Sequence, residues 1–476
     1  MNKYKKLAFN TIVFAIGNFG SKILLLLLTR LYTKYISPSG NSTKDLLETM
    51  ALFLIPIFSF GLQEYLIRFA LDHNYDKKEV FTTSAGMTAA GLAAMAVIVP
   101  LLKFIPFLGF IDGFTILLII YTCTSTIRML CAQFVRARDM VKLFSLDGIL
   151  ATLTLFLFNV LFIAKLDMGV KGFMLSVILS DLCSSIFLFI TGQLGKFLSI
   201  KSFSVPMMKT MLRFSVPLIP TIVMWTITSL SDRVFIREMH SDRAVLGADA
   251  AGLYGIANRV PNLISMVSTI FFQAWNMSAI TENESDDRSQ FYGKVYSAYE
   301  SILFIACAGL ILLVKPVTML LTNTDNFPEY STVYIYVPIL IAAVLFTSLD
   351  QFLGSIYNAT KHTKNSFWTA LAACVTNLVL NALLIPEWGI QGASIATLVS
   401  YLICFWLRII DARYYVPFSF NMIKNIFNTI VLLIMCGFVI VAPPKYMLWQ
   451  TALTLVVCVG CYQEVLTMAK KLLKRG

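Results

Sequence analysis

The chain of 476 residues is 58% hydrophobic and only 13% charged, with 38 Lys and Arg against 26 Asp and Glu. Soluble domains of ordinary composition carry roughly 25% charged residues, so these figures exclude an ordinary soluble protein. The apolar residues come in blocks that are hydrophobic on all sides, which is typical of helices in lipid. A formal net charge of +12 fits loops that face an anionic leaflet and implies no nucleic-acid partner.

Fourteen segments are apolar and long enough to cross a bilayer, for which a helix needs about 20 residues. In chain order they begin near Leu7, Leu46, Val80, Gly113, Leu143, Val170, Met211, Ala250, Lys294, Val333, Ser366, Ile390, Ile423 and Met447. The basic start leads into the first segment without a small-residue cleavage site, so we expect that segment to stay as a span. Lys and Arg are concentrated in alternate connections, which predicts that both termini lie in the cytoplasm.

An internal repeat links the fifth and sixth predicted spans to the eleventh and twelfth. GVKGFMLSVILSD at 169–181 aligns with GIQGASIATLVSY at 389–401, and Asn159 matches Asn381 once two residues are dropped from the loop. A shift of six helices preserves orientation, so we expect parallel repeats, although a Gly-x-x-Gly helix start is also common by itself. The predicted fold is an all-α polytopic membrane protein. It has an N-lobe at 1–200, a C-lobe at 201–412, and two further helices with a basic tail at 413–476.

Six basic residues fall inside the predicted spans, where each costs about 2.5–3.5 kcal/mol at a helix centre. They are Lys22, Arg30, Arg68, Arg128, Arg233 and Arg259. Arg30, Arg68 and Arg233 lie near helix ends, so their side chains have the alternative of reaching the headgroups. Arg68 can also pair with Glu64, one helical turn earlier.

Three of these basic residues lie deeper or beside polar neighbours, namely Lys22, Arg128 and Arg259. For them we favour an aqueous cavity over a structural ion pair. The excess of basic over acidic groups in the spans favours an anionic transported species. The predicted cationic cavity comprises Lys22, Arg30, Arg68, Arg128 and Arg259.

The acids inside the predicted spans are Asp181, Asp232 and Asp350. Three roles stay open for them: neutral acids that hydrogen-bond between helices, partners of the arginines, or coupling and gating groups together with Arg233. Pro217 and Pro220 interrupt the seventh predicted helix, where lost backbone hydrogen bonds permit either a hinge or a static kink.

The sequence has no pattern typical of an enzyme or a metalloprotein. All nine cysteines lie inside apolar runs, and the three histidines are scattered over polar connections. We find no Gly-rich phosphate loop and no nucleophile–base set. We therefore predict no catalytic residue, no metal site and no bound cofactor, while coupling to H+ or Na+ stays open.

Two stretches around the seventh and eighth predicted helices carry a resemblance to a known family. They are SLSDRVFI at 229–236 and AGLYGIANRVP at 251–261, supported by the GxxG starts of the sixth and twelfth helices. The chain resembles the multidrug/oligosaccharidyl-lipid/polysaccharide exporter (MOP) superfamily. Within it, the chain is most similar to the bacterial polysaccharide exporters, the Wzx-type O-antigen flippases.

This resemblance implies a flippase of the bacterial cytoplasmic membrane that serves lipopolysaccharide and other surface polysaccharide biosynthesis. An oligosaccharide repeat unit on undecaprenyl pyrophosphate would enter a cationic cavity between the lobes and leave at the outer face by alternating access. By position, Lys22, Arg30, Arg68 and Arg259 resemble the cavity cations of such flippases. The implied partners are the lipid-linked oligosaccharide, membrane lipids, a polymerase and other polysaccharide assembly proteins.

Other functions stay open within the same superfamily. A cation-coupled drug antiporter of the MATE branch would use Asp232 or Asp350 for coupling, but a first helix with Lys22 and Arg30 and no acid counts against it. A flippase for a peptidoglycan lipid precursor would have a similar cationic cavity. A membrane scaffold without transport would have no need of central charges.

Overall fold

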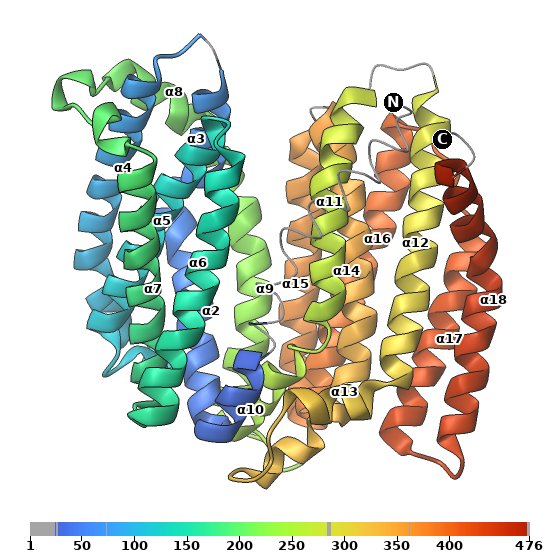
Figure 1. The fold of residues 1–476 in the computed structure, drawn as a ribbon. Helices are drawn as coiled ribbons and strands as arrows, with labels where there is room; N and C mark the ends of the chain where they lie inside the picture. The colour runs from blue at the N-terminus through green and yellow to red at the C-terminus, as the bar shows by residue number, and fades with distance from the viewer. Residues whose placement is uncertain (1–23, 25–26, 73, 283–286, 361, 474–476) are drawn as a thin grey trace. The chain divides into compact units, whose positions relative to one another are not determined.

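The computed structural model describes residues 24, 27–72, 74–282, 287–360 and 362–473, and within these ranges the chain forms helices and no strand (Figure 1). The all-α prediction is therefore confirmed. Most of the first predicted span lies outside the described residues, and so does Lys22. The chain divides into two compact units: the N-unit contains residues 18–238, and the C-unit contains residues 239–476.

The helices of the N-unit follow one another with short connections. They are α2 (Pro38–Phe58), α3 (Leu62–Leu71), α4 (Lys77–Ile98), α5 (Thr115–Ala137), α6 (Val141–Asn159), α7 (Gly169–Thr191), α8 (Val205–Ser215) and α9 (Ile219–Glu238). Shorter helical turns lie between them: η1 (Val99–Phe104), η2 (Pro106–Ile111), η3 (Val160–Lys165), η4 (Leu194–Phe197), η5 (Ile200–Ser202) and η6 (Val216–Leu218). Two hydrophobic clusters form the core of this unit, one around α2 and one around α3.

The C-unit is built in the same way and continues to the end of the described chain. Its helices are α10 (Ala248–Ala257), α11 (Asn262–Glu282), α12 (Arg288–Leu312), α13 (Val314–Leu321), η7 (Pro328–Ile335), α14 (Val337–Thr360), α15 (Thr363–Trp388), α16 (Ile390–Tyr415), α17 (Met422–Val441) and α18 (Tyr446–Leu473). In this unit α16 packs against both α14 and α15, just as α7 packs against both α5 and α6 in the N-unit.

Ten helices in the described ranges are long and apolar enough to cross a membrane. They correspond to the predicted third to seventh and ninth to thirteenth spans, which confirms a polytopic membrane protein. The second predicted span is α2, whose hydropathy is reduced by Lys44, Asp45 and Glu48. The eighth is broken into α10 and α11, and the fourteenth is α18, a helix of 28 residues.

Matching close contacts in the two units support the internal repeat. A Cβ added to Gly172 at the start of α7 would lie 3.1 Å from the carbonyl oxygen of Phe162, at the end of the preceding helix. A Cβ added to Gly392 at the start of α16 would lie 2.3 Å from the carbonyl oxygen of Leu384. Both glycines let one helix start close to the end of the one before, at positions that the sequence alignment makes equivalent.

The seventh predicted span contains α8, η6 and α9, and its prolines lie where the regular helix is interrupted. Pro217 is in the 3-10 turn η6 and Pro220 is the second residue of α9. All of these elements belong to the N-unit, because α8 packs against α3 and α4, and α9 packs against α2. The contact-based boundary between the units therefore lies after α9, at residues 238 and 239.

Candidate functional site

Two of the predicted cavity cations, Arg30 and Arg68, have exposed side chains. Arg68 lies in the last turn of α3, and its guanidinium carbon is 5.9 Å from the centroid of the Phe214 ring of α8. The side chain of Glu64, the proposed partner of Arg68, lies outside the described part of the chain. The exposed guanidinium of Arg68 at the end of α3 can bind a phosphate, whether on a substrate or on a lipid.

Arg128 in α5 forms an ion cluster with one carboxylate from α6 and one from α7. Its Nη1 is 3.1 Å from Oδ1 of Asp181, and its Nη2 is 3.6 Å from Oδ2 of Asp147. Its Nε donates to the Ser184 hydroxyl at 2.9 Å. The hydroxyls of Ser184 and Ser125 donate to Asp147 and Asp181 respectively. Both carboxylates are buried, whereas the arginine side chain is 31% exposed.

This cluster joins two predicted site residues, Arg128 and Asp181, and adds one that the sequence analysis did not select. A buried carboxylate needs an opposite charge and hydrogen bonds to offset its lost hydration. One guanidinium therefore compensates two carboxylates, and Arg128 contributes no net positive charge here. Asp147 was missed because it lies close to the predicted start of its span near Leu143, where a charged residue needs no special explanation.

Asp350 in α14 is 1% exposed, its carboxylate oxygens accept no hydrogen bond from a nitrogen or oxygen donor within the described residues, and the Cys404 thiol lies beside them. Arg408 of α16 lies beside it, and its Nη1 donates to the backbone carbonyl of Asp350 at 2.8 Å. The Nε of Arg408 donates to the Thr369 hydroxyl at 3.1 Å. Its Nη2 donates to the Ser366 hydroxyl at 3.4 Å, so the guanidinium is held by one carbonyl and two hydroxyls. Asp350 can therefore bind a proton, because a buried carboxylate with few hydrogen bonds is costly.

These two sites occupy equivalent places in the repeat. The shift that aligns Asn159 with Asn381 also aligns Arg128 with Asp350. In the N-unit the base lies on α5 and the acids on α6 and α7, whereas in the C-unit the acid lies on α14 and the base, Arg408, on α16. The two charges have exchanged helices, so equivalent sites in the two units have different chemistry.

The remaining predicted residues lie on α9 and after α10. Asp232 is buried, with 3% exposure. Its neighbour Arg233 is half-buried, and its Nη1 donates to the carbonyl oxygen of Ser229 at 2.7 Å and to the hydroxyl of that residue at 2.8 Å. Arg259 is half-buried in the turn between α10 and α11.

Lys44 in α2 is a buried cation that the sequence analysis missed. Its side chain has no exposed surface, and its ammonium group pairs with Asp45 and lies 4.0 Å from Glu48. The ammonium nitrogen is also 4.8 Å from the centroid of the Tyr32 ring and 5.0 Å from that of Phe173. The second span was predicted to begin near Leu46, so Lys44 was placed outside it. The closely spaced charges in KDLLE were the available signal for a structural pair.

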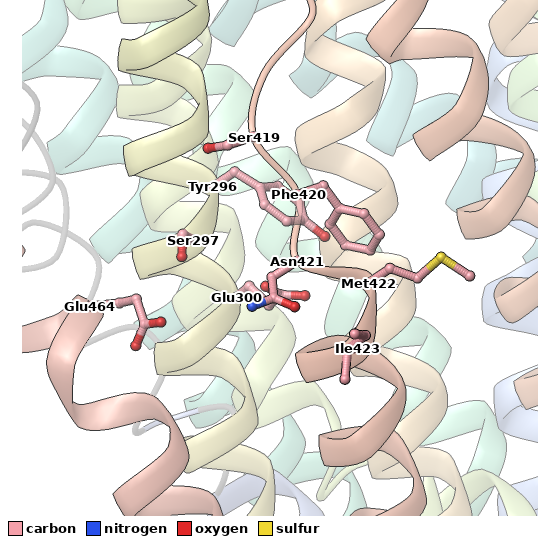
Figure 2. Close-up of a pocket in the computed structure, with 9 residues that line it drawn as sticks. All are labelled: Tyr296, Ser297, Glu300, Ser419, Phe420, Asn421, Met422, Ile423 and Glu464. Carbon is pink, nitrogen blue, oxygen red and sulfur yellow. The ribbon is translucent and has the colours of Figure 1, made fainter.

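The C-unit has a cavity of about 500 Å³ between α12, the segment before α17, and α18 (Figure 2). It is lined by Tyr296, Ser297, Glu300, Ser419, Phe420, Asn421, Met422, Ile423 and Glu464. Glu300 is buried and accepts a hydrogen bond of 2.6 Å from the amide of Asn425. Lys424 donates to Ser301 at 3.1 Å and pairs with Glu464 at 2.6 Å. This network fastens α17 and α18 to α12.

No group of three or more His, Cys, Asp and Glu side chains suited to a metal ion occurs within the described ranges. The charged side chains within the described ranges can form ion pairs, bind or release protons, and attract charged ligands.

Sequence comparison matches residues 47–330 of the chain to a family of polysaccharide biosynthesis proteins. The chain is 25% identical over 263 residues to the uncharacterized membrane protein MJ1375 of Methanocaldococcus jannaschii, covering 52% of this chain and 59% of that protein. It is 31% identical over 96 residues to the uncharacterized membrane protein YabM of Bacillus subtilis, covering 20% of this chain and 17% of that protein. The matches thus span less than two thirds of each relative.

Structural comparison shows the fold of known transporters. A multidrug resistance MATE family transporter of the MOP superfamily, in an inward-facing conformation, matches with a TM-score of 0.69 at 12% identity, over 88% of this chain and 100% of that chain. The lipid II flippase MurJ, in an inward closed conformation, matches with a TM-score of 0.65 at 17% identity, over 96% of this chain and 98% of that chain. With a family match over more than half of its length, this chain belongs to the polysaccharide biosynthesis protein family and has the fold of the MOP superfamily.

Proposed function

We propose that this protein is a flippase that moves an oligosaccharide repeat unit, linked to undecaprenyl pyrophosphate, across the bacterial cytoplasmic membrane. The observation that carries the proposal is its membership of a polysaccharide biosynthesis family combined with a fold shared with a lipid II flippase. The same findings support the coarser part of this proposal, a membrane transporter or flippase rather than an enzyme. O-antigen and other lipopolysaccharide glycans are the proposed cargo.

A pyrophosphate that crosses the hydrocarbon loses its hydration, so the protein must supply positive charge along the path. The proposed substrate cations are Lys22, Arg30, Arg68 and Arg259. Arg128 contributes less positive charge to the substrate path, because its guanidinium already faces two buried carboxylates.

Alternating access of the two repeats is the proposed mechanism, as in transporters built from parallel halves. The interruption of the seventh span at Pro217 is the proposed bending point, since the regular helix changes there to a 3-10 turn. In this proposal both termini lie in the cytoplasm. The proposed partners are a polymerase and other polysaccharide assembly proteins, which take over the repeat unit after export.

Asp350 supports coupling to a cation gradient, because its carboxyl group is buried and accepts no hydrogen bond from a nitrogen or oxygen donor within the described residues. The same feature favours a second candidate function, a cation-coupled drug antiporter. The neighbouring Arg408 counts against a metal ion at this place, because a guanidinium repels it. A proton is therefore the proposed coupling ion in either case.

The test is a deletion in the native host, with surface polysaccharide and the lipid-linked oligosaccharide pool measured together. We expect loss of surface glycan and accumulation of complete repeat units on undecaprenyl pyrophosphate, with rescue by the wild type. Unchanged glycan with new sensitivity to cationic drugs would favour the antiporter. Accumulation of a peptidoglycan precursor instead would identify the cargo as that lipid.

A further inference from the structure

The segment at 192–215, between α7 and η6, forms a surface that we call the basic shelf. It contains η4, η5 and α8, and it is fixed to the N-terminal part of α4 by three hydrogen bonds. The Thr82 hydroxyl donates to the carbonyl of Phe197 at 2.8 Å and accepts from the backbone N–H of Ser199 at 3.1 Å. The Thr83 hydroxyl accepts from the backbone N–H of Ser204 at 3.1 Å. The shelf is therefore an ordered part of the N-unit.

Packing at the end of α5 holds the shelf in the same place. The guanidinium carbon of Arg138 lies 4.4 Å from the centroid of the Phe197 ring, and its Nη1 donates to the carbonyl of Gly192 at 2.6 Å. A Cβ on Gly86 of α4 would lie 2.8 Å from the ring of Phe203, so α4 and the shelf are in direct contact. These contacts place the shelf at the level where α7 ends and α4 begins.

Apolar side chains of the shelf remain exposed. Ile200, in the turn η5, is 94% exposed, and Leu198, Val205 and Phe203 are 50%, 47% and 41% exposed. Their exposure to water is unfavourable, and burying each would contribute free energy in proportion to the area covered. Lipid acyl chains beside the spanning helices can provide that burial.

Four basic residues accompany these apolar side chains: Lys196, Lys201, Lys209 and Arg213 are all exposed. No Asp or Glu occurs between Asp181 and Asp232 in the sequence. The helix α8 is amphipathic: Met207 and Met211 are buried against the rest of the N-unit, whereas Lys209 and Arg213 are exposed on its outer face. Nearby exposed acids, Asp76 and Asp139, lie outside the shelf.

We propose that the basic shelf lies in the membrane interface and binds the headgroups of anionic phospholipids, with Ile200 inserted between the acyl chains. A soluble acidic partner would account for the charges, but it would not account for apolar side chains exposed at the level of the helix ends. The shelf is part of the N-unit and lies directly before η6, the turn that contains Pro217. This inference does not depend on which substrate the protein carries.

Amide hydrogen exchange of the purified full chain in lipid nanodiscs tests the proposal. Exchange at 192–215 is followed by mass spectrometry in phosphatidylcholine alone and in mixtures with phosphatidylglycerol. We expect slower exchange in the shelf as the anionic fraction rises, and faster exchange again at high salt, which screens the headgroups. Each basic residue near a membrane contributes about fivefold to affinity for an anionic surface.

Phosphatidylglycerol should no longer slow exchange in the shelf of a combined variant that removes its four basic charges. This shelf variant carries Lys196→Gln, Lys201→Gln, Lys209→Gln and Arg213→Gln. A matched control with the same change in charge should still show slower exchange in phosphatidylglycerol. It replaces four other exposed lysines: Lys165→Gln, Lys171→Gln, Lys315→Gln and Lys445→Gln. Ile200→Asn should speed shelf exchange in both lipids and keep the selectivity for phosphatidylglycerol. Equal exchange of the wild-type shelf in both lipids, or protection that persists in the shelf variant, would overturn the proposal.

Discussion

Replacing Arg128 with Gln would remove the counter-charge of two buried carboxylates in the N-unit. The guanidinium nitrogens lie 3.1 Å from Asp181 and 3.6 Å from Asp147, and both acids are nearly without exposed surface. Breaking a buried ion pair costs about 3–5 kcal/mol. Because the arginine side chain is 31% exposed, solvent already screens part of the interaction, and we expect a loss of about 2–4 kcal/mol in the free energy of unfolding.

Neutralising the acids should restore much of that loss. In the triple variant Arg128→Gln, Asp147→Asn, Asp181→Asn, the charges are gone, and the hydroxyls of Ser125 and Ser184 can still bond to the amides. Replacing a buried ion cluster with neutral groups of similar volume is often close to neutral in stability. We expect the triple variant to regain at least half of the stability that the single variant loses.

The assay is equilibrium unfolding of the purified protein in mixed detergent micelles, followed by helix content, with export measured in parallel in the deletion strain. A single variant within about 1 kcal/mol of the wild type would refute the ion-cluster interpretation. So would a triple variant no more stable than the single one. Normal stability with lost export would place Arg128 in the substrate path, as the sequence analysis expects.

Four further variants test other positions in the chain. Gly91→Ala should lower the free energy of unfolding by about 3 kcal/mol or more, because the new Cβ would lie 1.7 Å from the carbonyl oxygen of Phe58. Gly437→Ala, with open space around it in α17, should be neutral or stabilising by up to about 1 kcal/mol, and equal stability of the two variants would contradict this reasoning. Asp350→Asn should abolish the response of export to a protonophore, and an unchanged response would leave Asp350 a structural group. Arg259→Gln should reach the membrane at the wild-type level yet accumulate lipid-linked repeat units, whereas normal surface glycan would remove Arg259 from the proposed cavity.

The candidate sites were only partly visible in the sequence. Arg128 and Asp181 stand out because a charged residue within a long apolar run is conspicuous. Arg408, Asp147 and Lys44 do not, because each lies close to a predicted helix end, where charged residues are ordinary. Helix boundaries predicted from hydropathy are uncertain by a few residues, and that uncertainty decides whether such a residue is classed as buried.

The sequence by itself determined the properties that depend on local pattern. Long apolar runs must form helices in lipid, because only a helix satisfies its own backbone hydrogen bonds there. The GxxG helix starts, which are also local patterns, indicated the internal repeat. Tertiary structure alone decided which charges are compensated. Arg128 and Asp181 are 53 residues apart in sequence and 3.1 Å apart in space, and the equivalent base and acid in the C-unit lie on exchanged helices. Periodicity cannot reveal such pairs, because an ion pair depends on which faces of distant helices meet.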